Sequence, residues 1–452
     1  MAAPVHSHPA AGHDRPKASR RTRQVLGALL APFLVATVFG MVVLWPGDTS
    51  GNEALELGAP EELYDARVVR VERGNCTGTA ADADIRCSRP EVRLLEGPDE
   101  GRVISLQELS EAGGAARLDT GDTVVLGYFP EAPEGFEYSF ADRERRGPLL
   151  LLAGIFVVAV VALGRWKGLR ALLGLAVSLV VLTAFVLPAI LEGADPLAVA
   201  LVGAAVIAVL ALYLAHGVNA WTTTALIGTL ASLALVGVLG WFFVDAAQFS
   251  GLADEEATFL QVTAGQIDLR GLLLGGIVIG ALGVLDDVTV TQVSAVWELH
   301  GANPGYRRWG LYRAALRIGR DHIASTVNTL VLAYAGASLP LFLLFTQADQ
   351  GLGDVLNGEA VAVEVVRTLA GSIGLVASVP LTTALAVLVV GGSRAGSRAQ
   401  PEAVSESGSE AESEAGPPAS PTPAPAAAPT ADPRHYRSKR EERFWEEHGE
   451  DG

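Results

Sequence analysis

Apolar runs of about 20 residues recur along the chain, and such runs are the length that spans the hydrocarbon core of a bilayer as a helix. Each run is bounded by charged residues, Gly or Pro, and 50% of all residues are hydrophobic. The expected spans cover residues 24–45, 149–164, 169–190, 197–215, 221–244, 271–291, 323–346 and 369–391. The sequence therefore predicts a polytopic α-helical membrane protein with about eight transmembrane helices.

Positive charge collects on one side of this eight-helix arrangement. Arg and Lys residues that flank spans are retained in the cytoplasm, and the connections on the opposite side are mainly acidic here. Both termini are therefore expected to be cytoplasmic, in a plasma membrane. The basic residues are Arg15, Lys17, Arg20, Arg21 and Arg23 before the first span, Arg165, Lys167 and Arg170 after the second, and Arg307, Arg308, Arg313, Arg317 and Arg320 after the sixth.

The spans divide the chain into five parts: a basic cytoplasmic segment (1–23), a first helix (24–45), an exported segment (46–148), a seven-helix domain (149–391) and a tail (392–452). The first helix has an alternative interpretation as a cleaved signal peptide. Its apolar stretch is longer than a signal core, and no small-residue cleavage site follows, which favours an uncleaved anchor. The tail is rich in Pro, Ala, Ser and Glu, a composition typical of disorder.

The exported segment is typical of a small β domain. Runs such as YDARVVRVER and ARLDTGDTVVLGYFP are punctuated by turn signals at Gly97, Pro98, Gly121 and Asp122. These features predict a small β-barrel of the oligonucleotide/oligosaccharide-binding type or a related sandwich. Residues 46–148 carry 22 acidic and 11 basic side chains, so a nucleic-acid partner is not expected.

Cys76 and Cys87 are the only two cysteines in the chain, and both lie in the exported segment. An oxidising compartment permits a disulfide between them, which would stabilise the domain by about 3 kcal/mol in the chain-entropy model. Two free thiols or half of a metal site are the alternatives. A metal site needs His or carboxylate partners at a suitable spacing, and none is evident, so no metal or cofactor is expected.

The connection after the sixth span predicts an amphipathic helix. Trp309, Tyr312 and Leu316 follow at helical spacing, and Arg313, Arg317 and Arg320 fall on another face. A helix of this kind lies in the cytoplasmic interface, where it anchors to anionic lipid headgroups. Binding of a regulatory ligand is the alternative.

Two adjacent carboxylates, Asp286 and Asp287, lie at the end of the sixth apolar run. Charged groups at membrane depth cost a few kcal/mol or more, so they are usually functional or paired. Asp287 shares a helix face with Gly276, Gly280, Gly283 and Thr291, whereas Asp286 points about 100° away, toward the side of Thr289. The three glycines predict close approach of another helix, so that Asp287 faces protein rather than lipid.

The seventh span supplies an opposite wall for a polar lane. Asn328 and Thr329 lie on it, and His322 and Thr326 share a face. Asp286, Asp287, Thr291, Asn328 and Thr329 are the candidate lane for an ion, a proton or a substrate. Two close carboxylates can hold a cation or share a proton. The alternative is structural, with one aspartate pairing across the bundle to fix helix register.

Two stretches resemble the YibE/F-like membrane proteins: GALGVLDDVTVTQVSAVWEL and GRDHIASTVNTLVLAYAGASLPLFL. The β-rich segment that leads into FADRERRGPLL is also similar to that of the family. The resemblance covers roughly residues 60–390 and implies a bacterial inner-membrane protein with a small exported domain. The aspartate of the family's sixth-helix motif falls on Asp287, and Asp286 departs from that motif. The family implies no particular activity.

Together these features favour a transporter or permease of a small ion or small molecule, embedded in the lipid bilayer, with Asp287 as the coupling group. The alternative is a non-transporting scaffold or sensor whose exported domain binds an envelope partner. An enzyme is not expected, because no nucleophile and base occur at a suggestive spacing. A transporter should need Asp287, whereas a folded scaffold should tolerate Asp287→Asn, and flux measured in liposomes separates the two.

Overall fold

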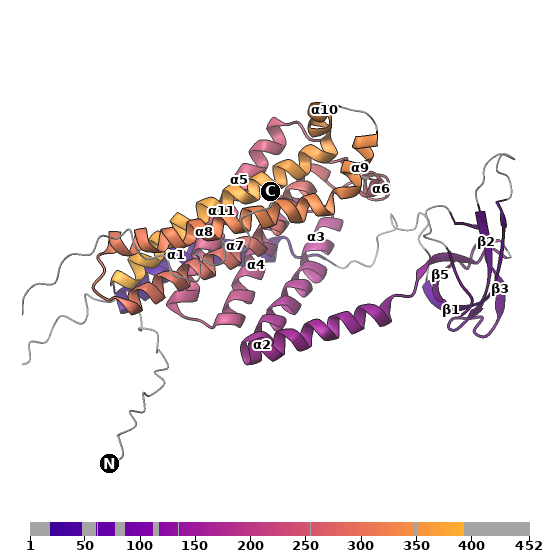
Figure 1. Ribbon diagram of the computed structural model, residues 1–452, viewed down its shortest axis with the longest axis horizontal. Helices are drawn as coiled ribbons and strands as arrows, with labels where there is room; N and C mark the ends of the chain where they lie inside the picture. Colours follow the sequence, from indigo (N-terminus) through magenta and orange to yellow (C-terminus); the bar gives the residue numbers. More distant parts are fainter. Residues whose placement is uncertain are drawn as a thin grey trace, which may run out of the picture. The chain divides into compact units, whose positions relative to one another are not determined.

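The computed structural model describes residues 19–47, 60, 62–76, 86–111, 117–133, 135–253, 255–347 and 351–392 (Figure 1). Most of the basic N-terminal segment (1–18) and the tail predicted to be disordered (393–452) lie outside these residues. The described chain is mostly helical and contains one antiparallel sheet. The helices are α1 (Arg20–Val43), α2 (Arg146–Val181), η3 (Leu182–Val186), α3 (Leu187–Leu191), α4 (Pro196–His216), α5 (Ala220–Ala246), α6 (Glu255–Thr263), α7 (Leu269–Ala302), α8 (Arg308–Ala337), α9 (Leu339–Gln347), α10 (Leu352–Asn357) and α11 (Glu359–Gly392).

Six helical segments among the described residues are long and apolar enough to cross a membrane. They are Arg20–Val43, Arg146–Leu191, Pro196–His216, Ala220–Ala246, Leu269–Ala302 and Glu359–Val390. The predicted count of eight is not confirmed, for two reasons. The expected second and third spans lie in one 46-residue segment, and the expected seventh span is split between α8 and α9.

The starts of several helices follow from capping chemistry. Ser19, Asp195, Asn219 and Asp268 each precede a helix and accept a hydrogen bond from a backbone N–H of its first turn. These side chains satisfy N–H groups that have no partner within the helix. The boundaries of α1, α4, α5 and α7 are therefore set locally, by residues that the sequence displays.

Helix α2 turns back on itself at Arg165, whose backbone is non-helical (φ 50°, ψ −130°). Just beyond the turn, a Cβ at Gly168 would collide with the carbonyl oxygen of Val160, so the close return of the chain requires glycine here. The first arm, residues 146–164, exposes apolar side chains on all sides, while the second arm contacts α4. The π turn η3 lies directly before Pro188, which has no N–H to donate back into the helix.

Helix α8 is longer than the interfacial helix expected after the sixth span. It runs without a break from Arg308 to Ala337, so the basic amphipathic stretch and the first half of the expected seventh span form one element. Its first half packs through Leu311, Ala315 and Gly319, whereas most side chains after Ser325 are exposed. The many charges of the first half explain why α8 is not among the six apolar segments.

Contacts between connections bring several helix ends together. The Gly47 N–H donates to Glu192 Oε2 (2.8 Å), and Gln266 Nε2 donates to the Leu191 carbonyl (3.1 Å). Arg270 pairs with Asp245 at 3.4 Å. The ends of α1, α3 and α5 and the start of α7 therefore lie at one end of the helical domain, which we call the acidic end. The opposite end, where α1 and α8 begin and α2 turns, is called the basic end.

The Glu359 carboxylate ties the start of α11 to the acidic end. It accepts hydrogen bonds from the backbone N–H of Ser250 (2.7 Å), from the Ser250 hydroxyl (2.9 Å) and from the backbone N–H of Gly251 (2.8 Å). Gly251 has a φ of 83°, and a Cβ there would approach the Leu269 backbone to 2.7 Å. This compact joint links the α5–α6 connection, the start of α7 and the start of α11.

The helices share one apolar core. Helices α4, α5 and α7 contribute buried apolar side chains to it from several of their faces. Its largest fully buried side chains include Phe185, Leu212, Leu226, Ile277 and Leu285. Helices α5, α7 and α11 contact one another in pairs, and α8 contacts both α7 and α11. This group of four helices positions the polar residues described below.

The sheet domain, residues 62–143, consists of β1 (Glu62–Asn75), β2 (Arg86–Leu94), β3 (Val103–Ser105), β4 (Leu109–Ser110), β5 (Thr123–Tyr128) and β6 (Tyr138–Arg143). The strand order is β3-β2-β1-β5-β6, with β4 also paired to β2, and all pairs are antiparallel. No pairing joins β3 to β6 among the described strands, so the sheet is open and the closed barrel is not confirmed. The turns expected at Gly97 and Gly121 are present, with φ of 97° and 101°.

The core of the sheet domain is separate from that of the helices. Val68, Val92, Leu94, Val124 and Leu126 are almost fully buried on one face of the sheet. The disulfide between Cys76 and Cys87 joins the end of β1 to β2.

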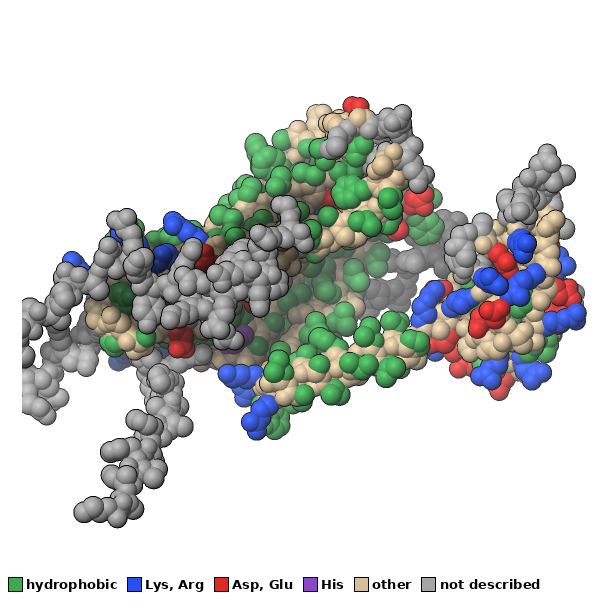
Figure 2. Space-filling view, viewed as in Figure 1, with side chains coloured by type: hydrophobic (Ala, Val, Ile, Leu, Met, Phe, Trp, Pro, Cys, Tyr) green, Lys and Arg blue, Asp and Glu red, His purple; other side chains and the backbone are tan. Residues whose placement is uncertain are grey.

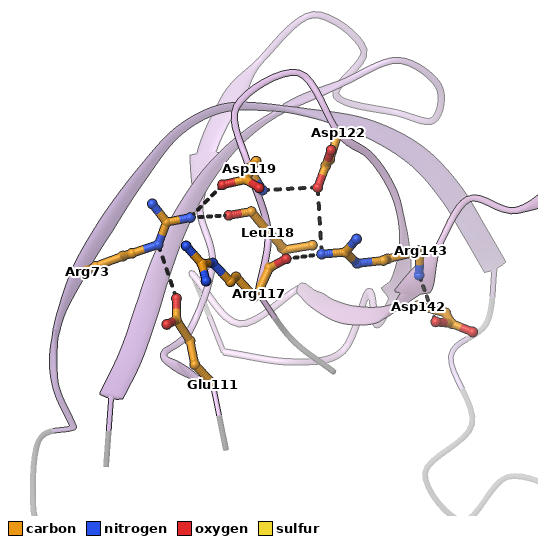
Figure 3. A network of polar contacts seen from close by, with 8 residues as sticks. All are labelled: Arg73, Glu111, Arg117, Leu118, Asp119, Asp122, Asp142 and Arg143. Carbon is orange, nitrogen blue, oxygen red and sulfur yellow. Dashed lines mark hydrogen bonds and ion pairs between the residues drawn. The ribbon is translucent and has the colours of Figure 1, made fainter. Parts of the chain in front are cut away.

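A network of polar contacts holds residues 117–122 against β1 and β6 (Figure 3). Arg73 donates to the Leu118 carbonyl and to Asp119 Oδ1, both at 2.7 Å, and to Glu111 Oε1 at 3.2 Å. From β6, Arg143 donates to the Arg117 carbonyl and lies 3.7 Å from Asp122. The connection before β5 is therefore fixed from both sides by guanidinium groups.

Tyr138 makes the stability of the sheet domain depend on pH in the alkaline range. Its side chain is 6% exposed, and its hydroxyl donates to Asp99 Oδ2 at 3.1 Å. Burial, together with this hydrogen bond, raises the pKa of Tyr138 above its usual value of 10.0. The folded domain then keeps a proton that the unfolded chain releases, so this contribution to stability is complete below pH 10 and is lost as the pH rises further.

We therefore expect Tyr138→Phe to lower the stability of the sheet domain at pH 8 by about 1 kcal/mol, since one hydrogen bond is lost. The difference between the two proteins should shrink as the pH rises above about 10. Limited proteolysis of the full-length protein with an alkaline protease measures the difference in stability. The rate of cleavage between residues 60 and 145 is compared in the two proteins at each pH. A difference that stays constant from pH 8 to pH 11 would contradict the role of Tyr138.

Candidate functional site on helix α7

Helix α7 carries both aspartates of the sequence motif and contacts α4, α5, α8 and α11. At a rise of 1.5 Å per residue, Asp286 lies about 26 Å along the axis from the start of α7 at the acidic end. A hydrocarbon core about 30 Å thick would therefore contain the aspartates near its boundary on the side of the basic end. The two side chains leave the helix on different faces, and their surroundings differ accordingly.

Asp286 points into the helical domain. Its side chain is half-buried, and its Oδ1 atom is fully buried without a hydrogen-bond partner among the described residues. Its backbone carbonyl accepts a hydrogen bond from the Thr289 hydroxyl at 3.1 Å. Buried polar atoms nearly always have a partner, so an unpartnered carboxylate oxygen indicates a place for a proton or a cation.

Asp287 faces outward, with a side chain that is 69% exposed. The expectation that Asp287 faces protein is therefore wrong, whereas Asp286 lies on the side of Thr289, as its position in the helix predicts. The Oδ2 atom of Asp287 lies 3.9 Å from Nε2 of His322 on α8, so the structure brings these two residues together. At this distance the interaction is electrostatic, since a hydrogen bond requires a shorter approach.

The remaining residues of the expected lane are on the surface of the helices. Thr291, Asn328 and Thr329 are exposed. The hydroxyls of Thr291 and Thr329 donate back to backbone carbonyls of their own helices, Asp287 and Ser325, at 2.9 and 3.0 Å. Within the part of the chain that the structure describes, no hydrogen bond joins Asn328 or Thr329 to α7. The lane between α7 and α8 is therefore open and incomplete.

The glycine stripe on α7 does not receive a helix along its length. Gly276, Gly280 and Gly283 are exposed. A Cβ at Gly280 would lie 3.2 Å from the Tyr334 hydroxyl of α8, and one at Gly283 would meet nothing within 4 Å. The expected close packing of another helix is thus limited to two side chains that reach the stripe, Tyr334 at Gly280 and Arg367 of α11 at Gly276.

Three polar contacts in the interior were not anticipated from the sequence. The hydroxyls of Thr229 on α5 and Thr289 on α7 are 2.7 Å apart, and both residues are fully buried. Nearby on α7, Gln292 is 3% exposed, and its Nε2 atom donates to the Ala315 carbonyl (3.0 Å) and to Thr383 Oγ1 (2.7 Å). Gln292 therefore connects α7 to α8 and α11 in one step.

Glycines make these polar contacts possible. At Gly319 on α8, a Cβ would lie 2.5 Å from Val379 and 2.7 Å from Gln292 Oε1. At Gly228 on α5, a Cβ would collide with the Thr382 hydroxyl of α11. Because neither position tolerates a side chain without displacement, the backbones of α5 and α8 approach the polar residues of α7 and α11 closely.

One sequence signal could have located this interior set. Asp286, Thr289 and Gln292 follow each other at a spacing of three, so they mark one face of α7. The glycine face was preferred because small residues favour helix contacts in membranes. In the folded chain, branched residues such as Ile277, Leu285 and Val288 are buried instead, since they remove more apolar area.

The long apolar helices and the polar residues enclosed between them define the class: this is a helical membrane protein. The YibE/F-like protein family matches residues 152–392, more than half of the chain. The chain belongs to the YibE/F-like protein family. The match covers every helix from the first arm of α2 to the end of α11 and excludes the sheet domain. No curated protein and no solved structure gives a significant match.

Gln292 should be important for stability. We expect Gln292→Leu to destabilise the protein by about 1–2 kcal/mol, because two buried hydrogen bonds are lost while volume is roughly kept. Thr291→Val is the matched control, since the Thr291 hydroxyl bonds only within α7, and it should change stability by less than about 0.5 kcal/mol. Thermal unfolding of both variants in one detergent measures the difference. Equal effects of the two substitutions would contradict the assigned role.

Proposed function

We propose that this protein is an ion-coupled transporter or permease of a small substrate, and that Asp286 binds the coupling proton or cation. The observation that carries the proposal is the buried, unpartnered Oδ1 atom of Asp286 among the described residues. Ionisation of a carboxylate with one oxygen buried and unbonded costs free energy, because that oxygen loses its hydration without gaining a hydrogen bond. Such a group is stable when it is protonated or lies beside a cation, and exchange between these states is the basic step of ion coupling.

The surroundings of Asp286 suit a cation or proton that arrives from the exposed face of α7. On the opposite side, polar groups connect α7 to the interior. Its sequence neighbour Asp287 and the imidazole of His322 are close together on the exposed face, where an arriving cation or proton meets negative charge first. On the interior side, the Thr289 hydroxyl contacts both the Asp286 carbonyl and the Thr229 hydroxyl. Polar atoms thus connect the backbone of Asp286 with α5 through the Thr289 and Thr229 hydroxyls.

Eight membrane crossings agree best with the directions of the helices. The turn at Arg165 divides α2 into two arms. Helix α7 ends at the basic end, yet α11 begins at the acidic end, where Glu359 contacts Ser250. Helix α8 must therefore return the chain across the membrane, although its charges keep its hydropathy low. With α1, α4 and α5, these elements make eight crossings.

The distribution of charge supports an orientation in a bacterial plasma membrane with both termini cytoplasmic. The basic end carries the arginines of α1, of the α2 turn and of the start of α8, whereas Glu192, Asp195, Asp245, Asp268 and Glu359 mark the acidic end. This orientation places the sheet domain outside the cytoplasm, in a compartment that permits the disulfide between Cys76 and Cys87.

Flux measurements test the proposal. The purified protein is reconstituted in liposomes that contain a pH-sensitive dye, and proton, Na⁺ and K⁺ gradients are imposed with and without a panel of metabolites. Because Asn cannot ionise, we expect Asp286→Asn to abolish flux. Asp287→Asn is the matched control, and it should retain part of the flux because the interior group is intact.

The outcomes distinguish the possible coupling groups, and they distinguish a transporter from a scaffold or sensor. Loss of flux in Asp287→Asn alone would move the coupling group to the exposed face. Absence of flux in the folded wild-type protein under every gradient would overturn the transporter proposal. It would favour a scaffold or sensor whose sheet domain binds a partner. Circular dichroism and size-exclusion chromatography establish that each variant is folded.

A further inference from the structure

The start of α8 presents a basic and aromatic face that the proposed transport site does not use. Trp309, Arg313, Arg317 and Arg320 follow at intervals of four, four and three residues, so they lie along one side of the helix. All four are exposed. The opposite side of the same segment, with Leu311, Ala315 and Gly319, is buried against the rest of the helical domain. The exposed side is therefore held rigidly by the packing of the other.

Aromatic rings on this face are arranged as a flat surface beside the charges. The rings of Trp309 and Tyr312 stack at a centroid distance of 5.3 Å and an interplanar angle of 13°. The Arg313 guanidinium lies over the Trp309 ring at 5.7 Å. Trp309 nevertheless remains 65% exposed. A large, amphipathic ring that is both ordered and exposed is typical of the boundary between water and lipid.

The guanidinium groups of this face form no ion pair with the carboxylates that the structure describes. Within the described part of the chain, no ion pair involves Arg307, Arg308, Arg313 or Arg317. Elsewhere in the same protein, exposed arginines such as Arg73 and Arg145 do have carboxylate partners. The basic face of α8 is thus a concentrated positive surface that an external anion can neutralise.

A pocket lies next to this face, at the connection between α7 and α8. It has a volume of about 790 Å³ and is lined by Asn303, Gly305, Tyr306, Arg307, Arg308, Trp309 and Gly310. Two arginines and two aromatic residues therefore meet at one open hollow. The hollow is large enough to admit a glycerophosphate headgroup, with the phosphate against the guanidinium groups and the apolar part against the rings.

We infer that the amino-terminal half of α8, with the adjoining pocket, binds the headgroup of an anionic phospholipid. The positive charge of the arginines favours an anionic ligand. Because Trp309, Tyr306 and Ile318 are exposed beside the arginines, a ligand that also has an apolar part is favoured. The start of α8 lies at the basic end, at the level of headgroups in the proposed orientation. A lipid satisfies both parts of the surface at once, whereas free phosphate would satisfy only the arginines.

The inference is tested on the full-length protein in detergent by native mass spectrometry, which counts retained lipids. The probes are phosphatidylglycerol, phosphatidylcholine and inorganic phosphate. We expect the wild-type protein to prefer phosphatidylglycerol over phosphatidylcholine. The triple variant Arg308→Gln/Arg313→Gln/Arg317→Gln should bind phosphatidylglycerol at least about tenfold more weakly, because each basic group near an anionic headgroup contributes severalfold.

The matched control is Arg20→Gln/Arg21→Gln/Arg23→Gln, which removes three exposed arginines from α1 at the same end of the helical domain. It should keep most of the binding. Equal loss in the two triple variants would overturn a site on α8, and so would equal binding of the two lipids by the wild-type protein. Displacement of phosphatidylglycerol by an equal concentration of inorganic phosphate would assign the site to free phosphate instead.

A second measurement needs no substitution. Binding of phosphatidylglycerol to the wild-type protein should weaken steadily as NaCl is raised, because salt screens exposed guanidinium groups. Binding that does not change with salt would contradict recognition by this basic face. Neither binding measurement requires transport activity. The lipid site and the proposed transport function are therefore tested independently.

Discussion

The helical domain depends on the requirement that polar side chains among apolar helices find partners inside the protein. Water is absent from the hydrocarbon region, so an unpaired amide or hydroxyl is costly there. Gln292 meets this requirement by donating to α8 and α11 at once, and the Thr229–Thr289 pair joins α5 to α7. These contacts fix the register of four helices whose apolar surfaces alone would permit sliding. Thr222, Ser372 and Thr382 also have buried hydroxyls without a partner among the described residues, but Asp286 differs from them because its unpartnered atom is a carboxylate oxygen.

Helix α8 combines two environments that sequence patterns usually assign to separate elements. Its first half has a buried side against α7 and α11 and an exposed side of arginines and aromatic rings. Its second half is largely exposed and contacts α7 near Gly280 through Tyr334. The same helix therefore supplies His322 beside Asp287, the carbonyl that receives Gln292, and the basic face at the end of the domain. A shift of α8 would affect all three together.

The sheet domain has its own core and its own network of polar contacts. Arg73 and Arg143 hold the connection before β5, and the disulfide closes the β1–β2 hairpin. The family match begins after this domain. The matched residues comprise the helices from the first arm of α2 to α11, and a partner of the sheet domain is a separate question.

The sequence by itself determined the membrane class, the family, the bounds of α4 and α5 to within two residues, the separation of charge between the two ends, and the cysteine pair. These follow from local composition, capping residues and spacing, which act over a few residues. The choice between Asp286 and Asp287 was decided only by the tertiary structure. Helix α7 is apolar nearly all round, so periodicity does not say which face is buried, and the large branched residues rather than the glycines took the interior. The partners of Gln292 likewise come from residues 23 and 91 positions away, a proximity that only the packing of helices creates.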